Sequence, residues 1–198
     1  MAKNTQPVLK RCRTLGVSPA VMGYSKSSNK NPGGQRRAKK SEFAMQLTEK
    51  QKVKFVYGIL EKQFRMYYEK AARMGGNTGE ELLSMIERRL DNVVYRLGFA
   101  ATRREARQLV NHGHFTVNGK RVNIPSYLVK VGDVVAVSEK SCSTTRFKKM
   151  KEDDAFVAAP KWLDRDKAKL TGTVIAAPAR DDIDFEIAEH LIVELYSK

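Results

Sequence analysis

The sequence has little cysteine and lacks the spacing of metal ligands. Its two cysteines, Cys12 and Cys142, lie 130 positions apart, and neither belongs to a C-x-x-C pair. His112, His114 and His190 are far from Cys12 along the chain, so the usual pattern of a zinc site is missing. We therefore expect no metal and no cofactor. Two cysteines without a partner motif also fit a reducing cytoplasm.

Long apolar runs and catalytic motifs are missing as well. No stretch approaches the roughly 18 apolar residues of a membrane span, and the basic N-terminus lacks the apolar core of a secretory signal. The chain has no G-x-x-x-x-G-K-[ST] loop, no G-x-S-x-G elbow and no H-E-x-x-H pair. The paired acids Asp153-Asp154 and Asp181-Asp182 fall in polar stretches, where nothing apolar would tune them for acid–base chemistry. We therefore expect a protein that is not an enzyme.

Positive charge is abundant and unevenly distributed. Lys and Arg number 37 against 22 Asp and Glu, which gives a net charge of +15. Residues 1–40 carry ten basic and no acidic residues, whereas residues 138–198 carry eleven basic and twelve acidic residues. A basic surface attracts polyanions because binding releases their condensed counterions. We expect a polyanion to contact the first two-thirds of the chain, and the last third to suit a protein neighbour or solvent.

Apolar residues at helical spacing predict a series of helices. The first extends from Ser41 to Gly58, the second follows it and ends at Gly75-Gly76, and the third is capped at Asn77-Thr78 and ends at Gly98. A short fourth helix begins at Thr102, with an acidic residue at its third position. A terminal helix is expected within residues 183–196.

Turn chemistry predicts short strands after the fourth helix. An Asn118-Gly119 turn indicates a hairpin between Phe115–Val117 and Val122. A Gly132-Asp133 turn indicates a second hairpin, between residues 129–131 and 134–137. Further strands are expected at residues 162–163 and 170–175, and the polar stretch 140–155 as a loop with some helix.

The start of the fourth helix carries the main candidates for phosphate binding. Arg103 and Arg107 share a helix face with Arg104 between them, and the backbone donors of a helix N-terminus would add to their grip on phosphate. The alternative is a solvated face. The hairpin residues Lys120 and Arg121 and the charge of the whole chain favour phosphate binding.

Other basic and aromatic positions allow two interpretations each. Lysines alternate over residues 50–54 on a helix that also carries Phe55 and Tyr57, which suits RNA, although an ordinary amphipathic helix has the same pattern. The cluster at residues 36–40 indicates an arm that orders on a phosphate backbone or, alternatively, a floppy tail. His112 and His114 are expected to cap a helix, face phosphate or lie on the surface. Tyr67, Tyr68 and Trp162 are expected in the core.

Seven runs of the sequence are distinctive: EKQK at 49–52, EKQFR at 61–65, NTGE at 77–80, RLDNVVYRLG at 89–98, EARQLV at 105–110, VNG at 117–119 and HLIVELYSK at 190–198. These runs closely resemble the bacterial ribosomal protein S4 family. The match is nearly continuous from Ser41 to Val137 and resumes at the C-terminus. One departure concerns the four N-terminal cysteines that bind zinc in many members, because only Cys12 is present here.

The resemblance implies an α+β fold. A helical domain would hold an inserted small α/β RNA-binding domain, made of a helix-turn-helix and short antiparallel strands, behind an irregular basic N-terminal arm. The bounds expected are 1–40 for the arm, 41–88 plus 183–198 for the helical domain, and 89–182 for the RNA-binding domain.

The resemblance also implies a structural component of the small ribosomal subunit, located on cytoplasmic ribosomes. It would be a primary binder of 16S rRNA, at a junction in the 5′ domain, that nucleates assembly of the subunit body. It would contact ribosomal protein S5 and other small-subunit proteins, influence translational accuracy, and meet mRNA where mRNA enters the subunit. The alternative is a free RNA-binding factor built on the same module, such as an RNA chaperone or a ribosome-rescue protein.

The candidate residues fall into three groups. Those expected to bind rRNA are Arg11, Arg13, Arg36, Arg37, Lys39, Lys40, Lys50, Lys52, Lys54, Arg65, Arg96, Arg103, Arg104, Arg107 and Lys120. The candidates near mRNA are Arg36, Arg37 and Lys39. The candidates for contact with S5 are Glu189, His190, Glu194 and Tyr196.

Overall fold

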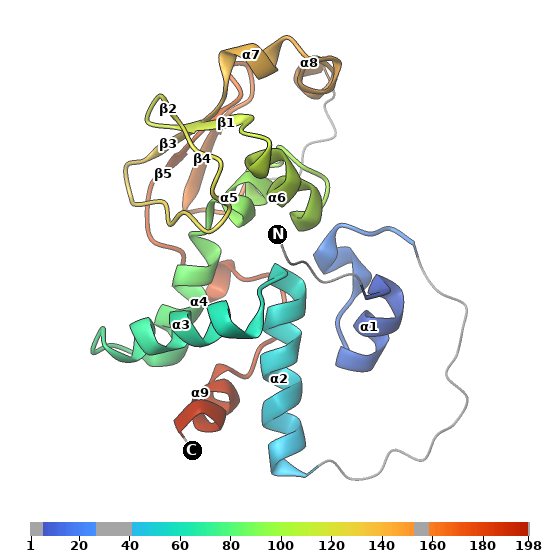
Figure 1. The fold of residues 1–198 in the computed structure, drawn as a ribbon, viewed down its shortest axis with the longest axis vertical. Helices are drawn as coiled ribbons and strands as arrows, with labels where there is room; N and C mark the ends of the chain where they lie inside the picture. Colours follow the sequence, from blue (N-terminus) through green and yellow to red (C-terminus); the bar gives the residue numbers. More distant parts are fainter. Residues whose placement is uncertain (1–5, 27–40, 153–158, 198) are drawn as a thin grey trace. The chain divides into compact units, whose positions relative to one another are not determined.

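The computed structural model describes residues 6–26, 41–152 and 159–197, which form two compact units (Figure 1). The first unit comprises residues 1–82 and 183–198, and the second comprises residues 83–182, as far as they are described. The mixture of helices with a small antiparallel sheet confirms the predicted α+β class. No described helix is both long and apolar enough to cross a membrane.

The first unit is built from helices whose ends the sequence marks. Helix α2 (Glu42–Tyr57) begins after Ser41, whose Oγ accepts a hydrogen bond from the backbone N–H of Ala44 at 3.3 Å, and ends at Gly58 with a φ of 65°. Helix α3 (Glu61–Ala72) follows. Helix α9 (Glu189–Ser197) packs against α2 and buries Ile192 completely. The terminal helix is therefore confirmed, but it begins later than residue 183.

The described part of the N-terminal segment contains regular structure. Helix α1 (Val8–Leu15) and the 3₁₀ helix η1 (Pro19–Met22) each end at a glycine in the left-handed conformation. Cys12, Leu15, Val17 and Met22 are buried, and the Cys12 thiol lies 3.9 Å from the sulfur of Met22. The described part of the arm is therefore more regular than expected, and a small apolar cluster holds its short elements.

The predicted third helix is interrupted, which corrects the sequence expectation. Helix α4 (Thr78–Glu87) ends before Arg88, and helix α5 (Leu90–Arg96) begins after Arg89. The segment 125–129 runs beside the break. There the backbone N–H of Leu90 donates to Tyr127 O at 2.8 Å, and that of Val129 donates to Arg88 O at 3.0 Å. These long-range hydrogen bonds replace those of a continuous helix, and apolar spacing alone does not reveal them.

Within the described residues, the second unit holds a five-stranded antiparallel sheet. Its strands are β1 (Phe115–Val117), β2 (Lys120–Arg121), β3 (Val134–Val137), β4 (Leu163–Asp166) and β5 (Thr171–Val174), in the order β2-β1-β3-β5-β4. The first predicted hairpin is confirmed. Val117 pairs with Lys120 across Asn118-Gly119, whose φ values of 50° and 78° are those of a type I′ turn.

The second predicted hairpin is wrong. Strand β3 pairs with β1 and β5, and residues 129–131 form no strand. The turn at residues 132–133 hydrogen-bonds to β5 instead, because Gly132 N–H donates to Val174 O and Val174 N–H donates to Asp133 O. A distant strand thus occupies the edge that a local hairpin would have used. The strands predicted near residues 163 and 171 are confirmed.

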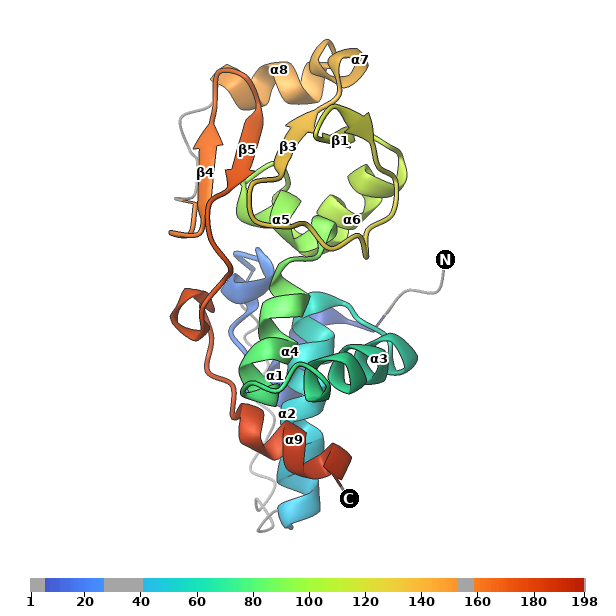
Figure 2. The ribbon, with the colours of Figure 1, turned by 90° about the vertical axis from the view of Figure 1, so that its left-hand side faces the viewer.

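One apolar core fills the second unit. Helices α5 and α6 (Arg103–Asn111) lie against the sheet (Figure 2). Their side chains meet those of the sheet in one cluster, together with the buried Phe147 and Trp162. The loop between β3 and β4 carries two short helices, α7 (Glu139–Cys142) and α8 (Thr145–Glu152). The polar stretch 140–152 is thus more helical than expected.

Candidate nucleic-acid interface

The N-terminus of α6 is fixed by a reciprocal cap. Thr102 Oγ1 accepts a hydrogen bond from the backbone N–H of Glu105 at 3.2 Å, and a carboxylate oxygen of Glu105 accepts one from the backbone N–H of Ala101 at 2.8 Å. The predicted helix start is therefore confirmed. The cap places Arg103 and Arg104 in the first turn, where free backbone N–H groups also favour an anion.

The arginines of α6 differ sharply in burial. Arg103 is only 6% exposed: its Nε donates to Asn92 Oδ1 at 2.9 Å, and its guanidinium carbon lies 4.4 Å from the centroid of the Tyr95 ring. Arg104 is exposed. Arg107 is partly buried, with Nη1 3.9 Å from Asp91 Oδ2. The helix thus presents Arg104 to solvent, while Arg103 attaches α6 to α5.

A network of buried charges braces the break between α4 and α5. Glu87 is fully buried and accepts hydrogen bonds from Arg96 at 2.8 and 3.1 Å and from Asn92 Nδ2 at 2.6 Å. Arg89 and Asp91 form a second buried pair with two hydrogen bonds of 3.0 and 2.7 Å. Buried charges are tolerated when each is paired and hydrogen-bonded. The guanidinium group of Arg96 is therefore engaged in the interior.

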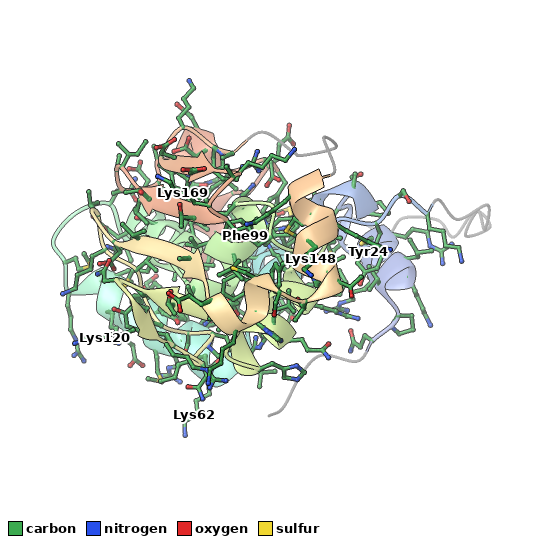
Figure 3. The ribbon with its side chains drawn as sticks, turned by 90° about the horizontal axis from the view of Figure 1, so that it is seen from above. Tyr24, Lys62, Phe99, Lys120, Lys148 and Lys169 are labelled. Atoms are coloured by element: carbon green, nitrogen blue, oxygen red, sulfur yellow. The ribbon has the colours of Figure 1, made fainter. Side chains whose placement is uncertain are left out.

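The hairpin presents one cation and uses another internally. Lys120 on β2 is exposed and projects from the surface (Figure 3). Arg121 instead donates to the backbone oxygens of Gly113 at 2.9 Å and His112 at 3.1 Å, which ties the hairpin to the end of α6.

The two histidines next to the hairpin differ in environment. His114 Nδ1 lies 2.8 Å from Ser141 Oγ, and the ring is partly buried. Burial, followed by the positive charges of His112, Arg121 and Arg146, lowers the pKa of His114. The lowered pKa favours the neutral form of the His114 ring, whereas His112 lies on the surface.

The three α2 lysines are paired within the first unit. Lys50 and Lys54 both donate to the carboxylate of Glu61, Lys50 at 3.0 Å. Lys52 donates to Glu49 at 2.7 Å and to the backbone oxygen of Glu186 at 3.4 Å. Their side chains are only 13–15% exposed. An RNA phosphate would therefore have to compete with protein carboxylates for these ammonium groups.

Two of the residues predicted to face S5 are tied to α2 and α3. Tyr196 donates its hydroxyl to Glu61 Oε1 at 2.7 Å and stacks on Tyr68 with ring centroids 4.7 Å apart. Glu194 accepts a hydrogen bond from Gln46 Nε2 at 3.0 Å.

The other two predicted S5 contacts and two apolar residues lie on α9 and α2. His190 is exposed and Glu189 is half-buried, beside Gly79. The sequence reading missed Phe43 and Met45, which are 60% and 43% exposed at the start of α2. Phe43 is at helical spacing from the buried Gln46 and Val53, so apolar spacing predicts it in the core and does not reveal its exposure.

The remaining candidates lie apart from these groups. Arg13 is exposed and Arg11 half-buried on α1, and Arg65 is exposed on α3, 3.2 Å from Glu69. The four basic residues predicted at 36–40 lie outside the described residues; they are Arg36, Arg37, Lys39 and Lys40. Among the residues that the structure describes, no group of three or more His, Cys, Asp or Glu side chains could hold a metal ion.

The chain matches known proteins over its whole length. The family profile described as "Ribosomal protein S4/S9 N-terminal domain" matches residues 3–87, and the profile "S4 domain" matches residues 88–135. The chain is 54% identical over 198 residues to small ribosomal subunit protein uS4 of Fusobacterium nucleatum, with all of both chains covered. It is 56% identical to the uS4 protein of Caldicellulosiruptor bescii and 52% identical to that of Clostridioides difficile, again with complete coverage of both chains.

Proposed function

Because the chain belongs to the uS4 family of small ribosomal subunit proteins, we propose that it binds 16S rRNA at a helix junction of the 5′ domain and nucleates assembly of the subunit body there. Members of this family are structural, non-enzymatic parts of the ribosome, and binding to rRNA and to other ribosomal proteins follows from that membership.

The observation that carries the proposal is the rigid presentation of cations around α6. Arg104 and Lys120 are exposed, and the elements beneath them are held by Arg103, Arg121 and the capped helix start. A fixed platform recognises folded RNA by its shape and phosphates rather than by base edges. Arg96 and Arg103 contribute by holding this platform, because their guanidinium groups are engaged inside the unit.

Two further partners belong to the same proposal. Contact with protein S5 is supported by the exposed Phe43 and Met45 on α2, beside α9 with its exposed His190. Contiguous exposed apolar surface often marks contacts with other proteins. An influence on translational accuracy would act through this contact. Contact with incoming mRNA is supported by the sequence alone, through the positive charges of Arg36, Arg37 and Lys39.

Co-sedimentation separates this proposal from a free RNA-binding factor. A structural component stays with small subunits through a wash at high salt and is present in roughly equal amount with the other subunit proteins. A free factor dissociates and is found in substoichiometric amount, and that outcome would reject the assembly role.

The S5 contact has its own test. Replacing Phe43 and Met45 by serine should weaken binding of purified S5 while leaving binding of the 5′-domain RNA unchanged. Equal binding of S5 by both proteins would show that this part of α2 faces something else.

A further inference from the structure

Helix α8 and the residues just before it are strongly basic, although the C-terminal third of the chain is slightly acidic as a whole. Residues 140–152, up to the end of α8, carry five basic residues and one acidic residue, Glu152, although residues 138–198 together hold more acidic than basic residues. The basic residues are Lys140, Arg146, Lys148, Lys149 and Lys151. We infer that α8 is a second phosphate-binding surface for RNA, beside the α6 platform. This inference rests on the proposed function and extends it to a segment beyond the matched S4 domain, which ends at residue 135.

The helix is anchored so that its lysines face solvent. Phe147 is 1% exposed and meets the Phe115 ring edge-on, with centroids 6.2 Å apart. Met150, three positions on, packs against the same core. Because these two residues define the inner face, Lys148 and Lys149 are left on the exposed side. Figure 3 labels Lys148.

The lysines of α8 differ from those of α2 in their partners. Among the side chains that the structure describes, Lys148, Lys149 and Lys151 form no hydrogen bond and no ion pair, whereas Lys50 and Lys54 share Glu61. A phosphate that binds at α8 therefore displaces no described carboxylate. Release of counterions from such a phosphate then favours binding at these three lysines.

One ion pair joins α8 to the start of α6. Arg146 Nη1 lies 2.6 Å from Glu105 Oε1, and the other carboxylate oxygen of Glu105 accepts the hydrogen bond from Ala101 that caps α6. Partial burial would raise the pKa of Glu105, but the hydrogen bonds from Arg146 and the backbone outweigh it and lower the pKa. The pair of Arg146 and Glu105 thus joins α8 to the start of α6, whose first turn carries the exposed Arg104. We therefore expect one RNA backbone to contact both helices.

The alternative is that these lysines only stabilise their own helix. Lys149 and Lys151 lie in the last turn of α8, where cations interact favourably with the helix dipole. That role affects the stability of the helix but gives no dependence of RNA binding on these side chains. The two roles are therefore separable by measuring stability and binding on the same variant.

The test compares two double variants that lose the same charge. Lys148→Gln with Lys149→Gln alters α8, and Lys161→Gln with Lys169→Gln removes two exposed lysines elsewhere in the second unit. Binding to a transcript of the 16S 5′ domain is measured over a series of KCl concentrations. The slope of log K against log salt is negative, and each lost phosphate contact should reduce its magnitude by roughly 0.7 to 0.9. We therefore expect the α8 variant, which loses two contacts, to have a slope smaller in magnitude by about 1.4 to 1.8. The control should change by less than half of that, and Lys148→Arg with Lys149→Arg should restore the slope.

Three other outcomes of the binding measurement would contradict either the α8 site or the proposed function. Equal losses of slope in both double variants would show that any exposed lysine contributes through the overall charge of the protein. That result would overturn the α8 site. An α8 variant that binds like the unaltered chain would overturn it as well, while leaving the proposed function intact. Failure of the unaltered chain to bind the transcript would instead reject the proposed function. Urea unfolding of each variant confirms that the fold is retained.

Discussion

At the residue scale, Glu61 combines several interactions in one partly exposed carboxylate. It accepts hydrogen bonds from Lys50, Lys54 and the hydroxyl of Tyr196. Partial burial would raise the pKa of Glu61, but these hydrogen bonds lower it from 4.5 to about 2. A carboxyl group whose pKa is lower in the folded state adds stability above its unfolded pKa, and this stability is lost as pH falls through the folded pKa.

The expected consequence is a pH-dependent difference between the unaltered protein and Glu61→Gln. As pH falls from 4.5 towards 2, the unaltered protein should lose about 1 kcal/mol more than the variant, a value reduced for the half-exposed side chain. Urea unfolding at several pH values measures it. Parallel stability curves for the two proteins would contradict the assignment of Glu61 as the anion of this cluster.

Arg103 and Arg104 are neighbours in the sequence with opposite expected roles. Arg103→Ala should lower the free energy of unfolding by about 2 to 4 kcal/mol, because it leaves Asn92 and Tyr95 without their buried partner. Arg104→Ala should change it by less than about 0.5 kcal/mol, as is usual for exposed positions, yet weaken binding of 5′-domain RNA. Urea unfolding and RNA titration check the two variants. The reverse pattern would show that Arg103 faces RNA.

The same pair shows where sequence reasoning reaches its limit at the residue scale. The cap at Thr102 predicts both the helix start and the presence of cations near it. Helical spacing places Arg103 and Arg107 on one face, but it does not tell whether that face meets solvent or a neighbouring helix. A buried arginine paired with an asparagine and a tyrosine ring is created by tertiary packing. The removal of both Arg103 and Arg107 is therefore expected to destabilise the fold as well as to reduce RNA binding.

At the scale of elements, β5 and the end of α5 approach each other too closely for a side chain at Gly172. A Cβ atom at this position would lie 2.4 Å from Leu97 Cδ2. Gly172→Ala should therefore destabilise the second unit by about 1 to 3 kcal/mol through overpacking. Gly76→Ala is the matched control, because its Cβ would meet only ordinary contacts at 3.5 Å and beyond. Equal urea midpoints for the two variants would show that α5 moves away at no cost.

The elements that the sequence predicted share local signals. Ser41, Gly58, Thr102 and the Asn118-Gly119 turn each act on residues within a few positions, so their effect is visible in the chain itself. The break at residues 88–89 and the pairing of β3 with β5 depend on partners about 35 or more positions away. Apolar periodicity and turn residues carry no information about such partners. For this reason the continuous third helix and the second hairpin were wrong predictions.

At the scale of the whole molecule, the first unit depends on two separate parts of the chain. It comprises residues 1–82 and the returning segment 183–198, in which Ile192 is fully buried and Tyr196 bonds to Glu61. Truncation after Asp182 should therefore raise amide exchange throughout α2 and α3. Exchange in the sheet of the second unit should remain unchanged. Hydrogen exchange detected by mass spectrometry reads the two units separately, and unchanged protection of α2 would contradict this dependence.

The central claim is that the chain binds rRNA mainly through its phosphates. The most direct measurement is the affinity for 5′-domain RNA as a function of salt concentration. If six to ten phosphates are neutralised, affinity should fall by roughly 10³ to 10⁵ between 50 and 200 mM salt. An affinity that changes little over this range would contradict a phosphate-binding surface that includes Arg104, Lys120 and the lysines of α8.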